Sequence, residues 1–78
     1  MENKVKSEPA LKTVMVFKTS LKYKKQIKPL AKSLNQYGKW NFDLEDCDNI
    51  LRVEAHPSHA KTIISLMQIH GYYCEELQ

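Results

Sequence analysis

The sequence predicts an α+β domain in which four antiparallel strands form one sheet and two helices cover one face of it. Three observations support this prediction. Stretches of strand-like and helix-like hydrophobic spacing follow one another in the order β-α-β-β-α-β. The chain has 78 residues, enough for one domain, and 42% of them are hydrophobic, as in ordinary globular proteins. Turn-forming residues separate the stretches.

The first strand is predicted at residues 13–17, after a tail of mixed charge. Residues 1–11 combine charged side chains with a proline and little apolar material, so we expect a flexible N-terminal tail and a domain over residues 12–78. The run from Thr13 to Phe17 is β-branched and apolar. Because it is apolar on both faces, it is expected to be a central strand.

A first helix is predicted over residues 21–36. Thr19 and Ser20 precede it and offer hydroxyl groups that can cap its first turn. Gly38 is well placed to end it. Pro29 interrupts it, so the helix either kinks there or has an irregular first turn with its true start near the proline. The apolar stripe of this helix consists of Tyr23, Ile27, Leu30, Ala31 and Leu34.

The next two strands are predicted to form a hairpin. Residues 40–45 alternate strictly, with Trp40, Phe42 and Leu44 on the apolar face. Residues 46–49 have the composition of a turn, and the strand pattern resumes over residues 50–54.

A second helix and a short last strand complete the predicted order. Pro57 suits a first helical turn, and Gly71 is expected to end this helix. Residues 72–77 then form the final strand. The apolar stripe of the helix consists of Ala60, Ile63, Ile64 and Met67.

This order of elements predicts a ferredoxin-like sandwich with strand order 4-1-3-2, because crossover connections are right-handed. In that arrangement three turns lie at the same end of the sheet. We therefore expect residues 19–23, 46–49 and 70–71 to be close neighbours.

Charge is divided unevenly along the chain. Residues 1–39 carry ten lysines and two glutamates, a net charge of +8, whereas residues 40–78 carry two basic and seven acidic residues, a net charge of −5. An uneven distribution of this kind favours electrostatic steering of a charged partner. A solvated lysine face on a helix is the alternative interpretation.

The apolar stripe of the first helix, the Trp40-x-Phe42-Asp43-Leu44-Glu45 strand and the Gly71-Tyr72 pair together make the chain similar to the heavy-metal-associated (HMA) domain of copper chaperones and metal pumps. The resemblance covers residues 12–77. It implies the ferredoxin-like fold, and a lysine-bearing first helix that docks an acidic partner domain. The family carries a Met-x-Cys-x-x-Cys metal loop between its first strand and helix.

That metal loop has no thiol in this chain. Aligning the family pattern on Ile27 places Lys18 at the methionine, Ser20 at the first cysteine and Tyr23 at the second, with Thr19 between. Hydroxyl and phenol oxygens are poor ligands for copper(I) and other soft ions. The metal transfer that the resemblance would otherwise imply is therefore not expected, and no cofactor is predicted.

Other candidate metal ligands are the remaining cysteines and histidines. Cys47 in the hairpin and His70 at the end of the second helix share the loop end and could form a two-coordinate site, although a free loop thiol and a helix-terminal histidine are the commoner interpretation. Cys74 is expected to pack in the core. His56 and His59 have a spacing that can bridge a metal but are more typical of a helix surface.

The favoured functional interpretation is a small cytoplasmic binding module, not an enzyme, that docks an acidic protein surface or associates weakly with a second copy. The residues assigned to docking are Lys18, Lys22, Lys24, Lys25, Lys28 and Lys32. Alternatives are a small anion held near Ser20, Lys22 and Lys25, or nucleic acid on the sheet. Acidic side chains on the predicted sheet make nucleic acid the weaker alternative. No signal peptide, membrane span or catalytic motif is recognised.

Overall fold

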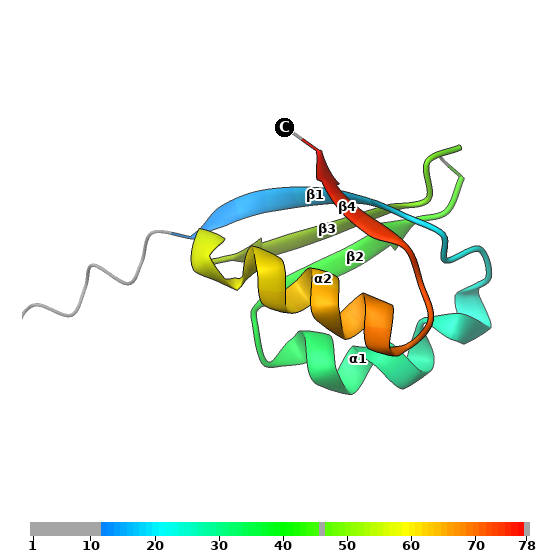
Figure 1. Ribbon diagram of the computed structural model, residues 1–78, viewed down its shortest axis with the longest axis horizontal. Coiled ribbons are helices and arrows are strands. Elements are labelled where there is room, and N and C mark those ends of the chain that lie inside the picture. Colours follow the sequence, from blue (N-terminus) through cyan, green and yellow to red (C-terminus); the bar gives the residue numbers. More distant parts are fainter. Residues whose placement is uncertain (1–11, 46, 78) are drawn as a thin grey trace, which may run out of the picture.

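The computed structural model describes residues 12–45 and 47–77, and its elements follow the predicted order (Figure 1). The tail predicted at residues 1–11 lies outside the described residues. The strands are β1 (Thr13–Thr19), β2 (Lys39–Asp43), β3 (Ile50–Ala55) and β4 (Cys74–Leu77). The helices are α1 (Lys28–Asn35) and α2 (Ala60–Ile69), preceded by the 3-10 turns η2 (Lys24–Gln26) and η3 (Pro57–His59).

The four strands form one antiparallel sheet with the order β2-β3-β1-β4, which read from β4 is 4-1-3-2. Both helices lie on the same side of this sheet (Figure 1). The predicted α+β class, with one four-stranded antiparallel sheet and two helices, is confirmed.

Strand β1 is central, as predicted, but it is buried on one face only. Met15 and Phe17 point into the core, whereas Val14 on the opposite face is 60% exposed. Val14 is apolar but exposed, because both helices cover the same side of the sheet and leave the outer face to solvent.

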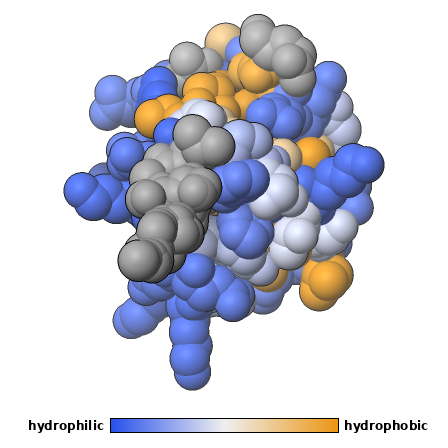
Figure 2. Space-filling view, turned by 90° about the vertical axis from the view of Figure 1, so that its left-hand side faces the viewer, coloured by the Kyte–Doolittle hydropathy of each residue, from blue (hydrophilic) through white to orange (hydrophobic). Residues whose placement is uncertain are grey.

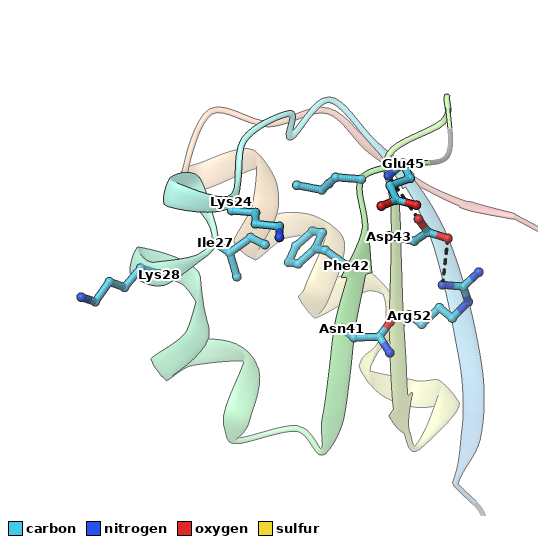
Figure 3. Close-up of a pocket in the computed structure, with 9 residues that line it drawn as sticks. Lys24, Ile27, Lys28, Asn41, Phe42, Asp43, Glu45 and Arg52 are labelled. Atoms are coloured by element: carbon cyan, nitrogen blue, oxygen red, sulfur yellow. Dashed lines mark hydrogen bonds and ion pairs between the residues drawn. The ribbon is translucent and has the colours of Figure 1, made fainter.

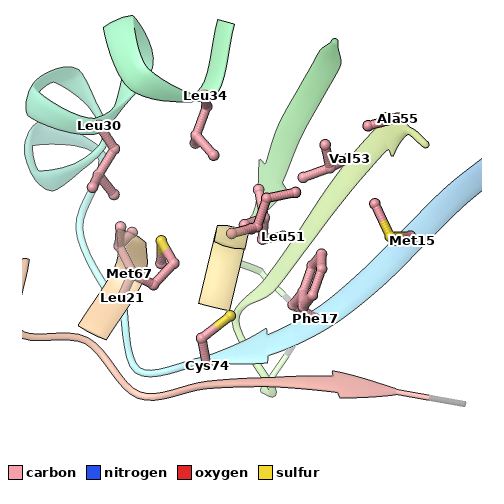
Figure 4. Close-up of a cluster of buried hydrophobic side chains, with 11 residues drawn as sticks. Met15, Phe17, Leu21, Leu30, Leu34, Leu51, Val53, Ala55, Met67 and Cys74 are labelled. Atoms are coloured by element: carbon pink, nitrogen blue, oxygen red, sulfur yellow. The ribbon is translucent and has the colours of Figure 1, made fainter. Parts of the chain in front are cut away.

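The core lies between the sheet and the two helices (Figure 4). Leu30 and Leu34 of α1 meet Ile63 and Met67 of α2 there, and all four are fully buried. The other buried members of the core are Met15, Phe17, Leu21, Leu51, Val53, Ala55 and Cys74. A chain of this length has room for one such core, so each of these side chains carries a large share of the stability.

Helix α1 begins later than the sequence predicts. It starts at Lys28 instead of residue 21, with Pro29 in its first turn, where the missing N–H has no helical partner to lose. The sequence left two alternatives open for Pro29, a kink within the helix or an irregular first turn with the true start near the proline. The structure shows the second. At the other end Gly38 has φ +151, and a Cβ there would overlap the Glu54 carbonyl oxygen. Only glycine therefore allows the chain to enter β2 at this point.

The second half matches its prediction with small shifts. Helix α2 ends before Gly71, whose φ of +90 is the left-handed conformation expected of a helix stop. The last strand begins at Cys74 instead of residue 72, because Tyr73 is held in the preceding turn by Ser20.

Candidate functional site

The loop end of the sheet, which we call the tip, brings together the segment after β1, the β2–β3 hairpin and the turn after α2. Thr19, which is buried, is held at its centre. Its amide donates to the carbonyl oxygens of Asp48 and Asn49, both at 3.2 Å, and its hydroxyl donates to the Asn49 carbonyl at 2.7 Å. The same hydroxyl accepts from the Leu21 amide at 3.2 Å. The predicted proximity of the first strand–helix junction and the hairpin is confirmed.

Ser20 joins the tip to the turn after α2. Its amide donates to the Tyr73 carbonyl at 3.1 Å, and its hydroxyl accepts from the Tyr73 amide at 2.8 Å. This pair of hydrogen bonds spans 53 residues of sequence. The side chain at the family's first cysteine position is therefore engaged in holding two segments together.

The first helical turn is capped by Gln26, a residue not predicted from the sequence for this role. Its Oε1 accepts from the amides of Lys22 and Tyr23 at 3.0 and 2.9 Å. The prediction that Thr19 or Ser20 caps this helix is wrong, because both hydroxyls bond across the tip instead. A glutamine three residues after the helix entry was the available signal, since a side chain at that position reaches back to the entry amides.

Tyr23, at the family's second cysteine position, is 60% exposed and lies outside the helix and the core. Its placement on the apolar stripe of the first helix is therefore wrong. Among the residues that the structure describes there is no group of three or more histidine, cysteine or acidic side chains that could hold a metal ion.

The two cysteines have different environments. Cys47 is exposed in the hairpin, and Cys74 is buried in the core, as expected for one of the two. Burial raises the pKa of the Cys74 thiol to about 12, so this side chain stays protonated and is a poor metal ligand at neutral pH. His70, the other candidate ligand, is exposed at the C-terminal end of α2.

The histidines at the start of the second helical segment have structural partners. Nδ1 of His56 lies 2.8 Å from the Ser58 hydroxyl and accepts from the Ser58 amide at 3.1 Å. His59 packs against Tyr37, with ring centroids 5.2 Å apart. These contacts favour the helix-surface interpretation over a metal bridge.

Five of the six lysines predicted to dock a partner lie within residues 22–32, the segment that includes η2 and the start of α1. Lys18 is separate, because its ammonium lies 3.8 Å from the Asp48 carboxylate. The other five are exposed, and none of them has an ion-pair partner within residues 12–45 and 47–77. We call them the lysine-rich surface: Lys22, Lys24, Lys25, Lys28 and Lys32.

A shallow groove of about 680 Å³ lies between the start of α1 and strand β2 (Figure 3). Ile27, Phe42 and Leu44 supply its apolar lining. Asp43 on its far wall pairs with Arg52 at 3.8 Å. The sequence did not indicate this groove, because it depends on where α1 begins relative to β2.

The face of the sheet away from the helices is mixed in character. Figure 2, which views the left-hand end of Figure 1, shows apolar side chains gathered at the top, over the sheet, and mostly hydrophilic side chains below. Val14 is exposed on this face, and the strand register places Arg52 and Glu54 beside it. Trp40 and Phe42 point to the helix side instead, in an edge-on pair with centroids 6.0 Å apart.

Comparisons with known proteins give no match of any kind: no family model, no curated protein and no solved structure is significantly similar to this chain. Within the described residues, no helix has both the length and the apolar character needed to cross a membrane.

Proposed function

We propose that this chain is a small cytosolic binding module with a ferredoxin-like, HMA-like frame that docks an acidic protein surface through its lysine-rich surface. The resemblance to the HMA domain suggests this role. The Thr19 and Ser20 hydroxyls, which lie on the segment equivalent to the family's metal loop, form hydrogen bonds across the tip, and this supports a module that does not carry the family's metal. The ferredoxin-like assignment is supported by the observed strand order and by two helices on one side.

One observation carries the proposal. The five lysines between residues 22 and 32 are all exposed and unpaired within the described residues, and no acidic residue lies between Glu8 and Asp43 in the sequence. A surface helix is usually interspersed with both signs of charge, which pair at short spacing. Because no acidic side chain is interspersed among these five lysines, they create a concentrated positive potential that attracts acidic surfaces and speeds their encounter.

The lysine-rich surface also has an aromatic neighbour. Tyr23 is exposed between Lys22 and Lys24, and the hydrogen bonds to Gln26 fix the backbone at this point. Tyrosines combine apolar area with a polar tip and are enriched in protein interfaces. We assign Tyr23 as the contact that supplies affinity where the lysines supply orientation.

The direct test is binding of a fluorescent poly-L-glutamate peptide, followed by anisotropy. Lys25→Glu with Lys32→Glu should weaken binding by roughly tenfold or more, since each change replaces attraction by repulsion. The matched control is Lys12→Glu with Lys61→Glu, which has the same net charge but lies outside the lysine-rich surface; it should weaken binding by less than about threefold. Equal losses in both pairs would mean that net charge alone drives binding and would overturn the proposal.

Two parallel titrations test the alternatives. Raising salt from about 20 to about 200 mM should weaken the poly-glutamate complex strongly, because exposed charges are screened. A labelled single-stranded oligonucleotide that binds more tightly than poly-glutamate would favour the nucleic-acid alternative. Copper(I) titrated against a competing chelator should not be retained; tight binding lost in Cys47→Ser would establish the metal site at the hairpin.

A further inference from the structure

Strand β2 has an unpaired edge. In the described part of the chain it pairs with β3 on one side and with no strand on the other. An open strand edge is a template for another strand, and proteins usually block it with charge, proline or a covering segment. Two hollows include residues of this strand, one beside Phe42 and Leu44, and one that extends from Trp40 to Val14 on the outer face of the sheet.

The sequence of this edge is complementary to itself. Strand β2 reads Lys39-Trp40-Asn41-Phe42-Asp43. If two copies pair in antiparallel fashion about Asn41, Lys39 of each lies opposite Asp43 of the other. Trp40 of each then lies opposite Phe42 of the other. Opposite charges and aromatic pairs at directly opposed positions stabilise a sheet.

This pairing is geometrically allowed whether the odd-numbered or the even-numbered residues of β2 direct their backbone N–H and C=O groups away from β3. Paired positions 39 and 43, and 40 and 42, are separated by an even number of residues. Both members of each pair therefore point the same way, toward β3 or away from it, and their side chains share a face. It is also the one antiparallel self-pairing in which all five strand residues have partners.

The other edge of the sheet behaves differently. Strand β4 reads Cys74-Glu75-Glu76-Leu77. Antiparallel self-pairing that keeps like faces together places either Glu75 or Glu76 opposite its own copy, and like charges directly opposite destabilise a sheet. Pairing of β4 with β2 of another copy does not close, so it would build an open chain of molecules. The charges therefore disfavour self-pairing through β4 and favour self-pairing through β2.

We propose that β2 is a self-association edge, and that two copies of this chain pair through it to form a closed two-fold dimer with a continuous eight-stranded sheet. Trp40 of each copy packs beside the hollow formed by Ile27, Phe42 and Leu44 of the other. With five residues per strand the interface is at the small end of specific contacts, so we expect a dissociation constant on the order of 100 μM. The inference stands apart from the proposed docking function, because it does not use the acidic partner.

The decisive experiment is sedimentation equilibrium up to about 1 mM protein, where a dimer of the expected strength is largely formed. Lys39→Glu and Asp43→Lys should each weaken the dimer by roughly tenfold, because each places like charges opposite one another. An equimolar mixture of the two variants should restore association to within about threefold of wild type, since every opposed pair is then of opposite sign. Glu75→Lys on the other edge is the control and should have no effect.

Several results would overturn the inference: a wild-type chain that is monomeric at the highest concentration, oligomers beyond the dimer, or single variants that associate as wild type does. Circular dichroism of each variant shows whether it is folded. If Asp43→Lys unfolds because it leaves Arg52 beside a second cation, Asp43→Asn replaces it, with a smaller expected loss. A wild-type chain that dimerises but does not bind poly-glutamate would contradict the docking proposal alone. A wild-type chain that binds poly-glutamate but stays monomeric would contradict the dimer alone.

Discussion

The two strand-to-helix junctions of this protein have similar backbones but very different surfaces. The first runs from β1 through η2 to α1, and the second runs from β3 through η3 to α2. Each passes through a 3-10 turn and has a proline near the start of a helical segment, Pro29 and Pro57. In the second junction His56 bonds to Ser58 and His59 packs on Tyr37. In the first, the lysine-rich surface and Tyr23 are exposed, and no such contact is made to them by any residue that the structure describes.

The comparison shows that an open surface does not require a loose backbone. The first junction is anchored by Leu21, which is fully buried, and by hydrogen bonds of Thr19 and Ser20 across the tip. A fixed backbone that presents unpaired charges loses little conformational entropy when it binds. This combination is what distinguishes the first junction as the candidate docking site.

The largest expected effect comes from removing the apolar anchor of the first junction. Leu21→Ala deletes a fully buried side chain and leaves a cavity, so the free energy of unfolding should fall by about 2–5 kcal/mol. Urea denaturation measures it. Lys61→Ala, on the exposed surface of α2, is the control and should change stability by less than about 0.5 kcal/mol. A loss as small as the control's would mean that the junction is not anchored through the core.

The second effect concerns the buried hydroxyl at the tip. Thr19→Val keeps the shape of the side chain but leaves the Leu21 amide without its acceptor, which should cost about 1–3 kcal/mol of stability. Ser58→Ala in the second junction removes only an exposed hydroxyl and should cost less than about 1 kcal/mol. Thermal unfolding of both variants compares the junctions directly. Similar losses would contradict the role of the Thr19 hydroxyl in anchoring the first junction.

The third effect depends on pH and involves Cys74, which pairs with Thr19 in the β1–β4 register. Its folded-state pKa of about 12 lies above the ordinary value of 9.0, so stability is fully present below pH 9 and declines as pH rises toward 12. At about pH 10 the Cys74 contribution to stability should be roughly 1 kcal/mol lower than at neutral pH. Denaturation of wild type and Cys74→Ala at both pH values isolates this contribution from the lysines and tyrosines. An equal pH dependence in the two proteins would contradict it.

The smallest effect should come from the cap of η2. Gln26→Ala removes the acceptor of the Lys22 and Tyr23 amides, which are exposed, so stability should fall by about 0.5–1 kcal/mol. Its main consequence should be a less ordered first junction. Hydrogen exchange of the amides of residues 22 and 23 should therefore accelerate, while exchange in the second junction remains unchanged. Unaltered exchange in both junctions would show that the cap does not hold the surface.

Much of the fold was predictable from local patterns. The alternation of Trp40, Phe42 and Leu44 placed β2 within two residues of its observed bounds, and Gly71 marked the end of α2. The first helix was misplaced because Tyr23 and Ile27 fit the periodicity of α1 although they precede it. Hydrophobic spacing does not distinguish a helix from a 3-10 turn that leads into it.

The candidate site was only partly predictable. The concentration of lysines could be read directly, whereas the use of the Thr19 and Ser20 hydroxyls could not, since their acceptor and donor lie 30 and 53 residues away in sequence. A serine or threonine hydroxyl can form a hydrogen bond that caps a helix, and it can equally form one that joins two loops. Which of the two it does depends on the groups that the fold brings within reach.

The sequence by itself determined the order of the elements, the one-sided distribution of lysines and the lack of thiols in the first junction, because these are properties of spacing and composition. Only the tertiary structure decided which face of β1 is buried, where α1 begins, and that β2 has an open edge. The physical reason is that burial and pairing depend on neighbours distant in sequence: both helices pack on one side of the sheet, and among the described strands β2 pairs only with β3.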